Sequence, residues 1–448
     1  MHTGTPGQRR VAPTRIDRIS PNDLTTLVSD RGPAPMNIAA VLVVDGGATL
    51  RRDEVLRALE TATAQVPRLR QRLRPVPLGC GRPYWVDDDF DIHRHVDFRQ
   101  VDDDHLWTEV ADLACHRLQS DRPLWRAVWL TGLDRDRAAL VVVAHHVLAD
   151  GLSGLAVLAA LTGTTATGQP TGAAHHTAYT RRALVADAWR SRVHGLGTLA
   201  TRARAAAAGA RDLGLDGRLP RRCPRTSFNR PTGPRRRLTV VERPLADAVA
   251  AGHRLGVTVN DLVLAAVSSA VAATLRDSGE TPDCIVISVP FSGRSWAGSG
   301  RLGNETGVVP FRIPLDVGRD ARLRTVARMS QAQRARPRAA SAAPLGVGFR
   351  ALARLGVLQW FVDHQPLVNT FVTNVRGPAH PWRFCGRPVT SVVPIAVTPG
   401  NVGVTFDVLS YAGTLGITIV TDPDVVADAD PLARHLAQEL DELVGPLG

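Results

Sequence analysis

The stretch His145-His146-Val147-Leu148-Ala149-Asp150-Gly151 joins a strand-like apolar run, residues 138–144, to a second apolar segment of small residues, 152–161. A neutral imidazole is the side chain best suited to removing a proton near neutral pH. The aspartate can hold the turn and orient its neighbours, and the glycine lets the backbone turn into the next helix without steric cost. The HHxxxDG spacing therefore predicts a histidine presented to a substrate at the end of a buried strand.

Strand geometry allows only one of the two histidines to face a substrate. Side chains alternate between the two faces of a strand. His146 therefore shares a face with Val142 and Ala144, and His145 shares the other face with Val143. A single histidine at a strand end is most often structural, but this spacing is rare by chance and favours catalysis. We expect one imidazole to act as the base and the other to pack or hydrogen-bond in the interior.

Length and composition limit the possible classes of protein. The chain has 448 residues, more than the roughly 250–300 that one hydrophobic core accommodates, so two cores are expected. Its five scattered cysteines contain no CxxC spacing, so we expect no disulfide framework, no metal site and a reducing compartment. The first 20 residues are polar and basic, and no apolar run reaches the roughly 18 residues of a membrane span. Neither secretion nor a membrane-spanning helix is expected.

Periodicity and turn residues divide the chain into an N-terminal half, 1–165, an arginine-rich helical linker, 166–237, and a C-terminal half, 238–448. In the first half, a helix begins near Ser20, strands are expected at 36–45, 83–86, 90–96, 123–130 and 138–144, and further helices at 49–66, 106–118 and 152–161. In the second half, helices are expected at 258–275 and 430–444, strands at 284–289, 307–313 and 367–374, and a strand meander at 388–397, 401–409 and 414–421.

The positive charge is concentrated in the linker. Residues 162–237 hold fifteen arginines against three aspartates and no glutamate, which accounts for the whole net charge of +12. A helix over 180–213 would carry an apolar stripe that includes Leu184, Ala188 and Trp189, with arginines around it. Two compatible roles remain open for this helix, a strut between the halves with its arginines in water, or a basic amphipathic helix on an anionic membrane surface.

Further motifs accompany HHVLADG along the chain. They are SPND at 20–23, PMNI at 35–38, PLW at 123–125, PTGPRR at 231–236, VND at 259–261, LGN at 302–304 and TNVRGP at 373–378. In this order they resemble the bacterial wax ester synthase/diacylglycerol acyltransferase family. The family's SNVPGP motif is matched except at Thr373 and Arg376, where serine and proline are usual. Chloramphenicol acetyltransferase-like enzymes and peptide-synthetase condensation domains share HHxxxDG, but the ND and NVxGP elements favour the lipid acyltransferases.

The resemblance implies an α/β fold of two chloramphenicol-acetyltransferase-like halves with mixed sheets and an active-site tunnel between them. It also implies transfer of a fatty acyl group from acyl-CoA, a substrate, to the hydroxyl of diacylglycerol or of a long-chain alcohol, with no cofactor. By this resemblance His146 is the base and the hydroxyl attacks directly, in keeping with the absence of a GxSxG nucleophile elbow. No serine or cysteine would then become acylated.

The remaining site residues follow from the same resemblance. The catalytic motif is His145, His146 and Asp150, with Asp150 stabilising the turn. Residues that bind substrate or line the tunnel are Gly151, Asn260, Asp261 and Asn374. Asn260 is the best candidate for a donor to the oxyanion of the tetrahedral intermediate. Asp261 also fits a capping-box helix start with Thr258, and Trp125 is expected to serve core packing.

Three alternatives remain open at this stage. One is a condensation-like transferase with a carrier-bound acyl donor or an amine acceptor, and another is a non-catalytic lipid-surface protein. Nucleic-acid binding through the arginine-rich linker lacks a recognition motif and interleaved aromatic residues, so no nucleic-acid partner is expected. We expect a cytoplasmic protein that associates peripherally with the inner face of the membrane or with lipid bodies.

Overall fold

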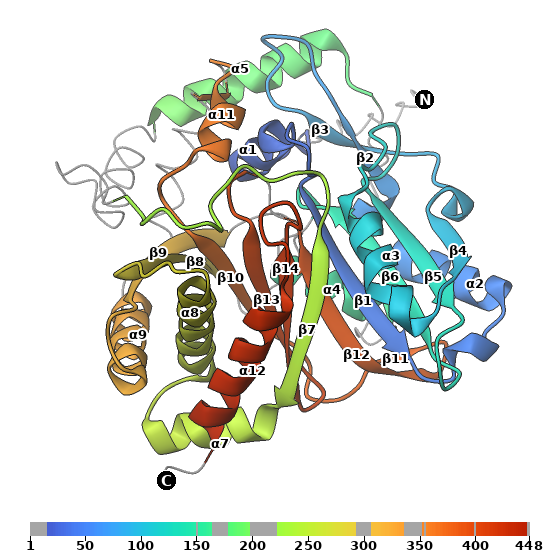
Figure 1. The fold of residues 1–448 in the computed structure, drawn as a ribbon. Helices are drawn as coiled ribbons and strands as arrows, with labels where there is room; N and C mark the ends of the chain where they lie inside the picture. The colour runs from blue at the N-terminus through green and yellow to red at the C-terminus, as the bar shows by residue number, and fades with distance from the viewer. Residues whose placement is uncertain are drawn as a thin grey trace, which may run out of the picture.

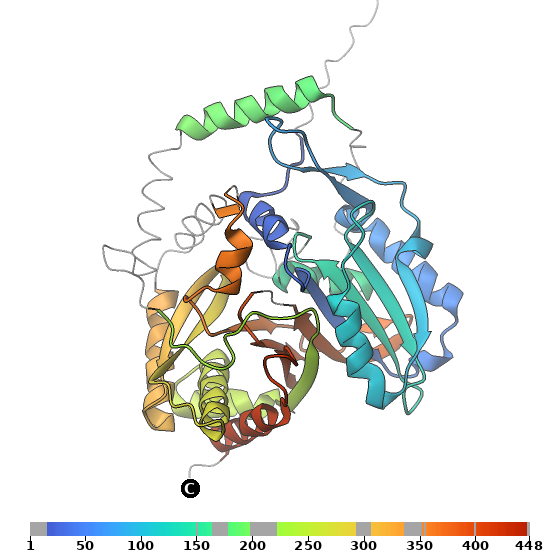
Figure 2. The ribbon, with the colours of Figure 1, turned by 45° about the horizontal axis from the view of Figure 1, so that its top comes forward.

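The computed structural model describes residues 16–148, 151–163, 178–197, 222–292, 306–335, 352–353, 355–397 and 400–445. Two six-stranded mixed sheets, each with its own helices, lie beside one another, and Figures 1 and 2 show them from two sides. The α/β fold with mixed sheets and two cores predicted from the sequence is confirmed. The boundaries of the two halves and of the linker stay a prediction.

The first sheet carries the histidine motif. Its strand order is β11-β12-β1-β6-β5-β4, with bounds Arg383–Phe384, Arg387–Ala396, Asn37–Val44, Ala138–His145, Trp125–Thr131 and Val96–Gln100. Helices α2 (Arg52–Ala64) and α4 (Gly151–Leu161) contribute to the core on one face, and α3 (Asp103–Cys115) to the core on the other. The central strands β1 and β6 are apolar on both faces because both faces are covered. Helix α1 (Pro21–Ser29) precedes β1, and β2 (Gln71–Arg74) pairs with β3 (Tyr84–Asp87) outside this sheet.

The second sheet belongs to the C-terminal part of the chain. Its order is β7-β14-β13-β10-β8-β9, with bounds Arg237–Pro244, Thr414–Thr421, Val404–Tyr411, Thr370–Arg376, Cys284–Ser292 and Thr306–Pro314. Its core includes residues of four helices, α7 (Leu245–Leu255), α8 (Val259–Asp277), α9 (Arg319–Arg334) and α12 (Asp430–Val444). Helix α11 (Leu358–Asp363) comes just before β10.

The prediction of a C-terminal strand meander is wrong in its topology. The three strands form, but β12 pairs antiparallel with β1 of the first sheet, whereas β13 pairs with β10 and β14 of the second. Apolar alternation predicts a strand but not the strand with which it pairs, because the free edge of any sheet with a covered face suits the same pattern.

The prediction of a strand at 90–96 is also wrong. Asp91 accepts a hydrogen bond from the His93 N–H and starts a short helical turn, Ile92–Arg94, so that β4 begins only at Val96.

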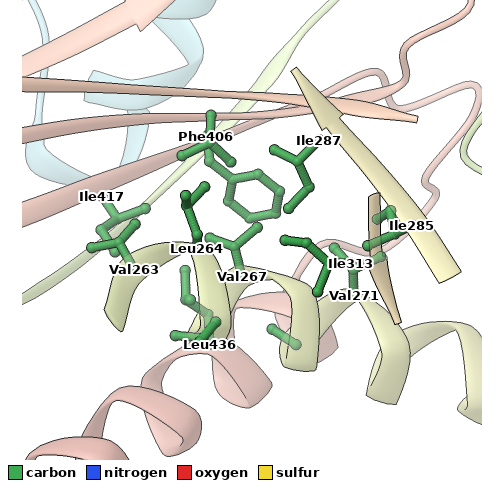
Figure 3. Packing of buried hydrophobic residues seen from close by; sticks show 14 of the residues in the cluster. Val263, Leu264, Val267, Val271, Ile285, Ile287, Ile313, Phe406, Ile417 and Leu436 are labelled. Atoms are coloured by element: carbon green, nitrogen blue, oxygen red, sulfur yellow. The ribbon is translucent and has the colours of Figure 1, made fainter. Parts of the chain in front are cut away.

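Helix α8 is the centre of the second core (Figure 3). Its apolar residues, among them Val263, Leu264, Val267 and Val271, pack against the sheet and against α12. The strand residues labelled in the figure are Ile285, Ile287, Ile313, Phe406 and Ile417, and Leu436 belongs to α12. Helix α8 starts with the predicted capping box, in which Thr258 Oγ1 accepts the Asp261 N–H and Asp261 Oδ2 accepts the Thr258 N–H.

Among the described helices, α8 alone is long and apolar enough to cross a membrane. Because 78% of that window is buried inside the protein, this is only weak evidence for a membrane span.

Helix α5 (Arg181–Gly197) is the described part of the helix predicted at 180–213, and the rest of that prediction lies outside the described residues. Leu184 packs into a small core with Tyr84 and Cys80. Asp187 forms an ion pair with Arg18, 2.7 Å between Oδ2 and Nε. These contacts attach α5 to the first half of the chain, whereas Val185, Trp189 and Val193 on the same helix are exposed.

We expect Leu264→Ala to lower the free energy of unfolding by about 2–5 kcal/mol, because it leaves a cavity in the second core. Leu78→Ala is the matched control, since the Leu78 side chain is fully exposed, and we expect a change within about 0.5 kcal/mol. Thermal melts of both variants measure the difference. Equal melting temperatures would show that α8 does not hold this core.

Candidate active site

The two histidines lie where β6 ends between two neighbouring strands. The His145 N–H donates to the Leu124 carbonyl at 2.9 Å, and the His146 N–H donates to the Met36 carbonyl at 2.8 Å. The two backbone N–H groups are therefore held by two different segments, one on each side of β6. His146 lines a cavity together with Val142 and Ala144, whereas His145 is buried at 4% exposure. The alternation predicted from the strand places the two imidazoles on opposite faces, as the structure shows.

The His145 imidazole is held in one tautomer. Its Nδ1 accepts a hydrogen bond from the Val147 N–H at 3.0 Å, so the ring proton belongs on Nε2. Nε2 then donates to Asp30 Oδ2 at 3.3 Å. With both ring nitrogens engaged inside the protein, His145 fixes the turn that follows β6. Its place in catalysis stays a prediction.

Asp30 links this turn to the start of β1. Its Oδ1 accepts the Met36 N–H at 2.9 Å and a hydrogen bond from Arg117 Nη1 at 2.8 Å. Burial acts to raise the pKa of Asp30, but the hydrogen bonds from His145 and Met36 and the charge of Arg117 outweigh it and lower the pKa. The carboxylate is therefore ionised at neutral pH. Met36 in turn accepts the His146 N–H, so Asp30 positions both histidines.

The cavity beside His146 lies between the two sheets and encloses about 1000 Å³ of empty space, which includes part of its open mouth. One wall comes from β1, β6, β12 and α4, and the other from β10 and β13. Among the described lining residues, three have polar side chains: His146, Thr373 and Asp407. The other lining residues are alanine, glycine, proline, valine, leucine or isoleucine. A chain of methylene groups can be buried in such a space without leaving many polar groups unpaired.

The glycine of the motif lies at the start of α4. Gly151 is the first residue of that helix, and Gly154, Leu155 and Leu158 of α4 line the cavity. Asp150 lies outside the described residues, so its predicted role in the turn stays a prediction. The motif thus connects a cavity-lining strand to a cavity-lining helix.

The structure brings Asn260 and Asn374 together but does not place them among the described residues that line the cavity. Asn374 Nδ2 donates to Asn260 Oδ1 at 3.1 Å, which joins β10 to the start of α8. Asp261 is buried in the capping box of α8, and Arg334 approaches its Oδ2 at 3.9 Å. Along β10 the neighbours of Asn374, Thr373 and Val375, line the cavity instead. The substrate roles predicted for these residues remain predictions.

The expected packing role of Trp125 is confirmed. The side chain is 2% exposed, its Nε1–H donates to the Leu69 carbonyl at 2.7 Å, and its ring stacks on His95 with centroids 4.7 Å apart. Burial lowers the pKa of His95, which favours the neutral ring in this stack. The PLW motif therefore stabilises the strand beside β6 without contributing to the cavity.

Sequence reasoning missed Thr373 and Asp407 as cavity residues. Asp407 stands between the apolar residues Phe406 and Val408, and a carboxyl at such a position in a strand is a signal worth following, because a buried carboxyl needs partners. Thr373 stood out as a departure from the family's motif, in a segment that the resemblance places near the cleft between the halves, but no role was predicted for it. Only the pairing of β10 with β13 brings the two together, with Thr373 opposite Asp407.

Family comparison agrees with this geometry. Residues 19–263 match the model of the wax ester synthase/diacylglycerol acyltransferase catalytic domain, and residues 302–444 match that of the WS/DGAT C-terminal domain. The chain belongs to the wax ester synthase/diacylglycerol acyltransferase family. A Mycobacterium tuberculosis protein named "probable diacylglycerol O-acyltransferase" is 31% identical over 428 residues, 91% of each chain.

Solved structures support the fold of this family member. The wax ester synthase/diacylglycerol acyltransferase from Marinobacter aquaeolei matches with a TM-score of 0.67 at 19% identity, over 96% of this chain and 98% of that one. The first condensation domain of the calcium-dependent antibiotic synthetase matches with a TM-score of 0.63 at 19% identity, over 96% of each chain. The two-half architecture expected from the sequence is thereby confirmed.

We expect Asp30→Asn to lower the melting temperature at neutral pH, because the ionised carboxylate is hydrogen-bonded by His145 and paired with Arg117. A carboxyl whose pKa is lowered on folding contributes stability above its unfolded value, near 3.8, and loses it as pH falls through the folded pKa. The difference between variant and wild type should therefore shrink on acidification below that value.

The matched control for Asp30→Asn is Asp53→Asn, since Asp53 is 53% exposed in its ion pair with Arg57. An exposed pair of this kind contributes about 0–1 kcal/mol. If Asp30→Asn changes the melting temperature no more than this control, Asp30 does not hold the histidine turn.

Proposed function

We propose that this protein transfers a fatty acyl group from acyl-CoA to the hydroxyl of a lipid acceptor, diacylglycerol or a long-chain alcohol, with His146 as the general base. The observation that carries the proposal is the position of His146 in the wall of an otherwise largely aliphatic cavity between the two sheets. Membership of the wax ester synthase/diacylglycerol acyltransferase family supports the same reaction.

A hydroxyl is a weak nucleophile at neutral pH and needs a base within hydrogen-bond reach. In the proposed reaction, His146 takes the acceptor's proton as its oxygen attacks the thioester carbonyl. The tetrahedral intermediate then collapses, the carbon–sulfur bond breaks, and the imidazolium returns the proton to the thiolate of CoA. An ester and free CoA are the products. The largely aliphatic lining offers water few hydrogen-bond partners, which limits hydrolysis of the thioester.

We expect His146→Ala to lower the rate of acyl transfer by about 10²–10⁴-fold, the usual cost of losing a general base. The assay incubates purified protein with palmitoyl-CoA and either dioleoylglycerol or hexadecanol, and measures ester by chromatography and free CoA by thiol titration. The melting temperature should stay close to that of wild type, because His146 is only partly buried.

Thr405→Val serves as the control in this assay, because Thr405 is buried on β13 but does not line the cavity. A His146→Ala protein with wild-type activity would rule out His146 as the general base. Transfer from an acyl group on a carrier-protein phosphopantetheine, with none from palmitoyl-CoA, would replace the proposal by the condensation-like alternative.

We further propose that this protein works peripherally at a membrane or lipid-body surface, on the cytoplasmic side. Helix α5 exposes Val185, Trp189 and Val193 at spacings of four residues, so they share one face. The largest exposures among them are 64% for Trp189 and 55% for Val193. Trp360 on α11 is 66% exposed, and α5 and α11 lie toward the same end of the molecule (Figures 1 and 2). Tryptophan suits the boundary between headgroups and acyl chains.

The charge of α5 fits an anionic surface. Arg181, Arg182, Arg190 and Arg192 are all exposed on this helix. An arginine held close to an anionic lipid surface contributes about 1 kcal/mol. The same end of the molecule carries α1, whose last turn leads to Asp30 and the histidine turn.

We expect the double variant Trp189→Gln/Trp360→Gln to bind anionic vesicles several-fold more weakly than wild type, because it loses two interfacial anchors. Co-sedimentation with phosphatidylcholine/phosphatidylglycerol vesicles measures binding, and raising the salt concentration should weaken it further. The control is Val249→Gln on α7, an exposed apolar residue toward the opposite end of the molecule. Equal binding by wild type, the double variant and Val249→Gln would show that these tryptophans do not bind the membrane, and α5 would then serve as a strut on the first half.

A further inference from the structure

Asp407 is a buried carboxyl in the wall of the cavity that the proposed reaction does not use. It lies on β13 between Phe406 and Val408, which both belong to the core around α8, and points to the opposite face of the sheet. The residue is 3% exposed and lines the cavity. Its immediate partners are the Ala396 N–H, which donates to Oδ2 at 2.7 Å, and the hydroxyl side chain of Thr373.

The strand register gives the place of this carboxyl relative to His146. Ala144, Ile38 and Ala396 form one row across β6, β1 and β12, and all three line the cavity. Neighbouring strands are about 4.8 Å apart, so Ala396 lies on the order of 10 Å from Ala144. His146 follows two residues after Ala144. The imidazole and the carboxyl therefore face one cavity from strands close enough for a single lipid acceptor to lie between them.

We propose that Asp407, together with Thr373, hydrogen-bonds an ester oxygen of the acceptor and thereby selects a glycerolipid over a simple fatty alcohol. The proposal rests on the acyl-transfer function proposed above and names the acceptor class for the same site. Diacylglycerol has two ester groups beside its reacting hydroxyl, so one of them can reach Asp407 while the hydroxyl contacts His146. A long-chain alcohol has a single oxygen, and only its methylene groups would face the carboxyl.

The protonation state of Asp407 agrees with this role. Burial raises the pKa of Asp407 to about 7, against the opposing hydrogen bonds from Ala396 and Thr373. A large fraction of the carboxyl is therefore protonated near neutral pH and can donate a hydrogen bond to an ester carbonyl. Ionised Asp407 has no proton to donate. A buried polar group left unpaired against hydrocarbon costs on the order of tenfold in rate or affinity.

The test compares kcat/KM for dioleoylglycerol and for hexadecanol at saturating palmitoyl-CoA. In wild type we expect dioleoylglycerol to be preferred. We expect Asp407→Val to lower the ratio of the two kcat/KM values by roughly tenfold or more. Asp407→Asn should keep most of the preference, because its amide still accepts the Ala396 N–H and still donates. Thr405→Val, a buried hydroxyl on the same strand outside the cavity lining, should leave the ratio unchanged.

A purely structural role would give a different result. If Asp407 only ties the end of β12 to β13, both acceptors lose activity equally in Asp407→Val, and this outcome overturns the proposal. A wild-type enzyme that acylates hexadecanol but not dioleoylglycerol also overturns it, while the acyl-transfer function stands. Acylation of neither acceptor contradicts the proposed function itself.

The pH dependence of the ratio keeps the proposal falsifiable if Asp407→Val does not fold. We expect the wild-type preference for dioleoylglycerol to fall as pH rises above about 7, and to stay constant in Asp407→Asn. The strands against Asp407 present Thr373, Thr418 and Ala396, none of which titrates. Among the described lining residues the other titratable group is His146, which acts on both acceptors and so cancels in the ratio. A wild-type ratio that is flat with pH overturns the proposal.

Discussion

The pairing of β12 with β1 is the constraint on which the rest of the structure depends. It inserts a strand from residues 387–396 into a sheet whose other long strands come from the first third of the chain. Because β13 follows β12 in the chain and belongs to the second sheet, β12 and β13 hold the two sheets beside each other, with the cavity of His146 between them. The cavity can therefore combine His146 from one half with Thr373 and Asp407 from the other.

The two adjacent histidines divide the work of positioning and chemistry. His145 uses both ring nitrogens inside the protein, one on the Val147 N–H and one on Asp30. His146 turns toward the cavity, and its backbone is fixed by Met36, whose own N–H is bound by Asp30. A general base must be held within hydrogen-bond reach of its substrate, so a rigid turn supports the proposed role. The aliphatic lining serves the same reaction by burying acyl and alkyl chains.

Local patterns could be predicted from the sequence, whereas partners distant along the chain could not. The alternation of faces along β6, the capping box of α8 and the terminal helix α12 depend on neighbours within a few residues, and all are confirmed. The partner of β12 depends on which sheet edge is open, which the chain's local pattern does not specify. Asp407 was missed for the same reason. It becomes a cavity residue only because β13 pairs with β10, and the local sequence pattern does not specify that pairing.

Direct attack without an acyl-enzyme is the central claim of this account, and intact-protein mass spectrometry tests it most directly. The protein is mixed with palmitoyl-CoA in the absence of acceptor, quenched in acid and weighed. We expect an unmodified chain, because His146 only moves a proton and the cavity's described lining holds no serine or cysteine. A mass increase of one palmitoyl group, formed rapidly and discharged on adding dioleoylglycerol or hexadecanol, would contradict it and point to a covalent nucleophile such as Thr373.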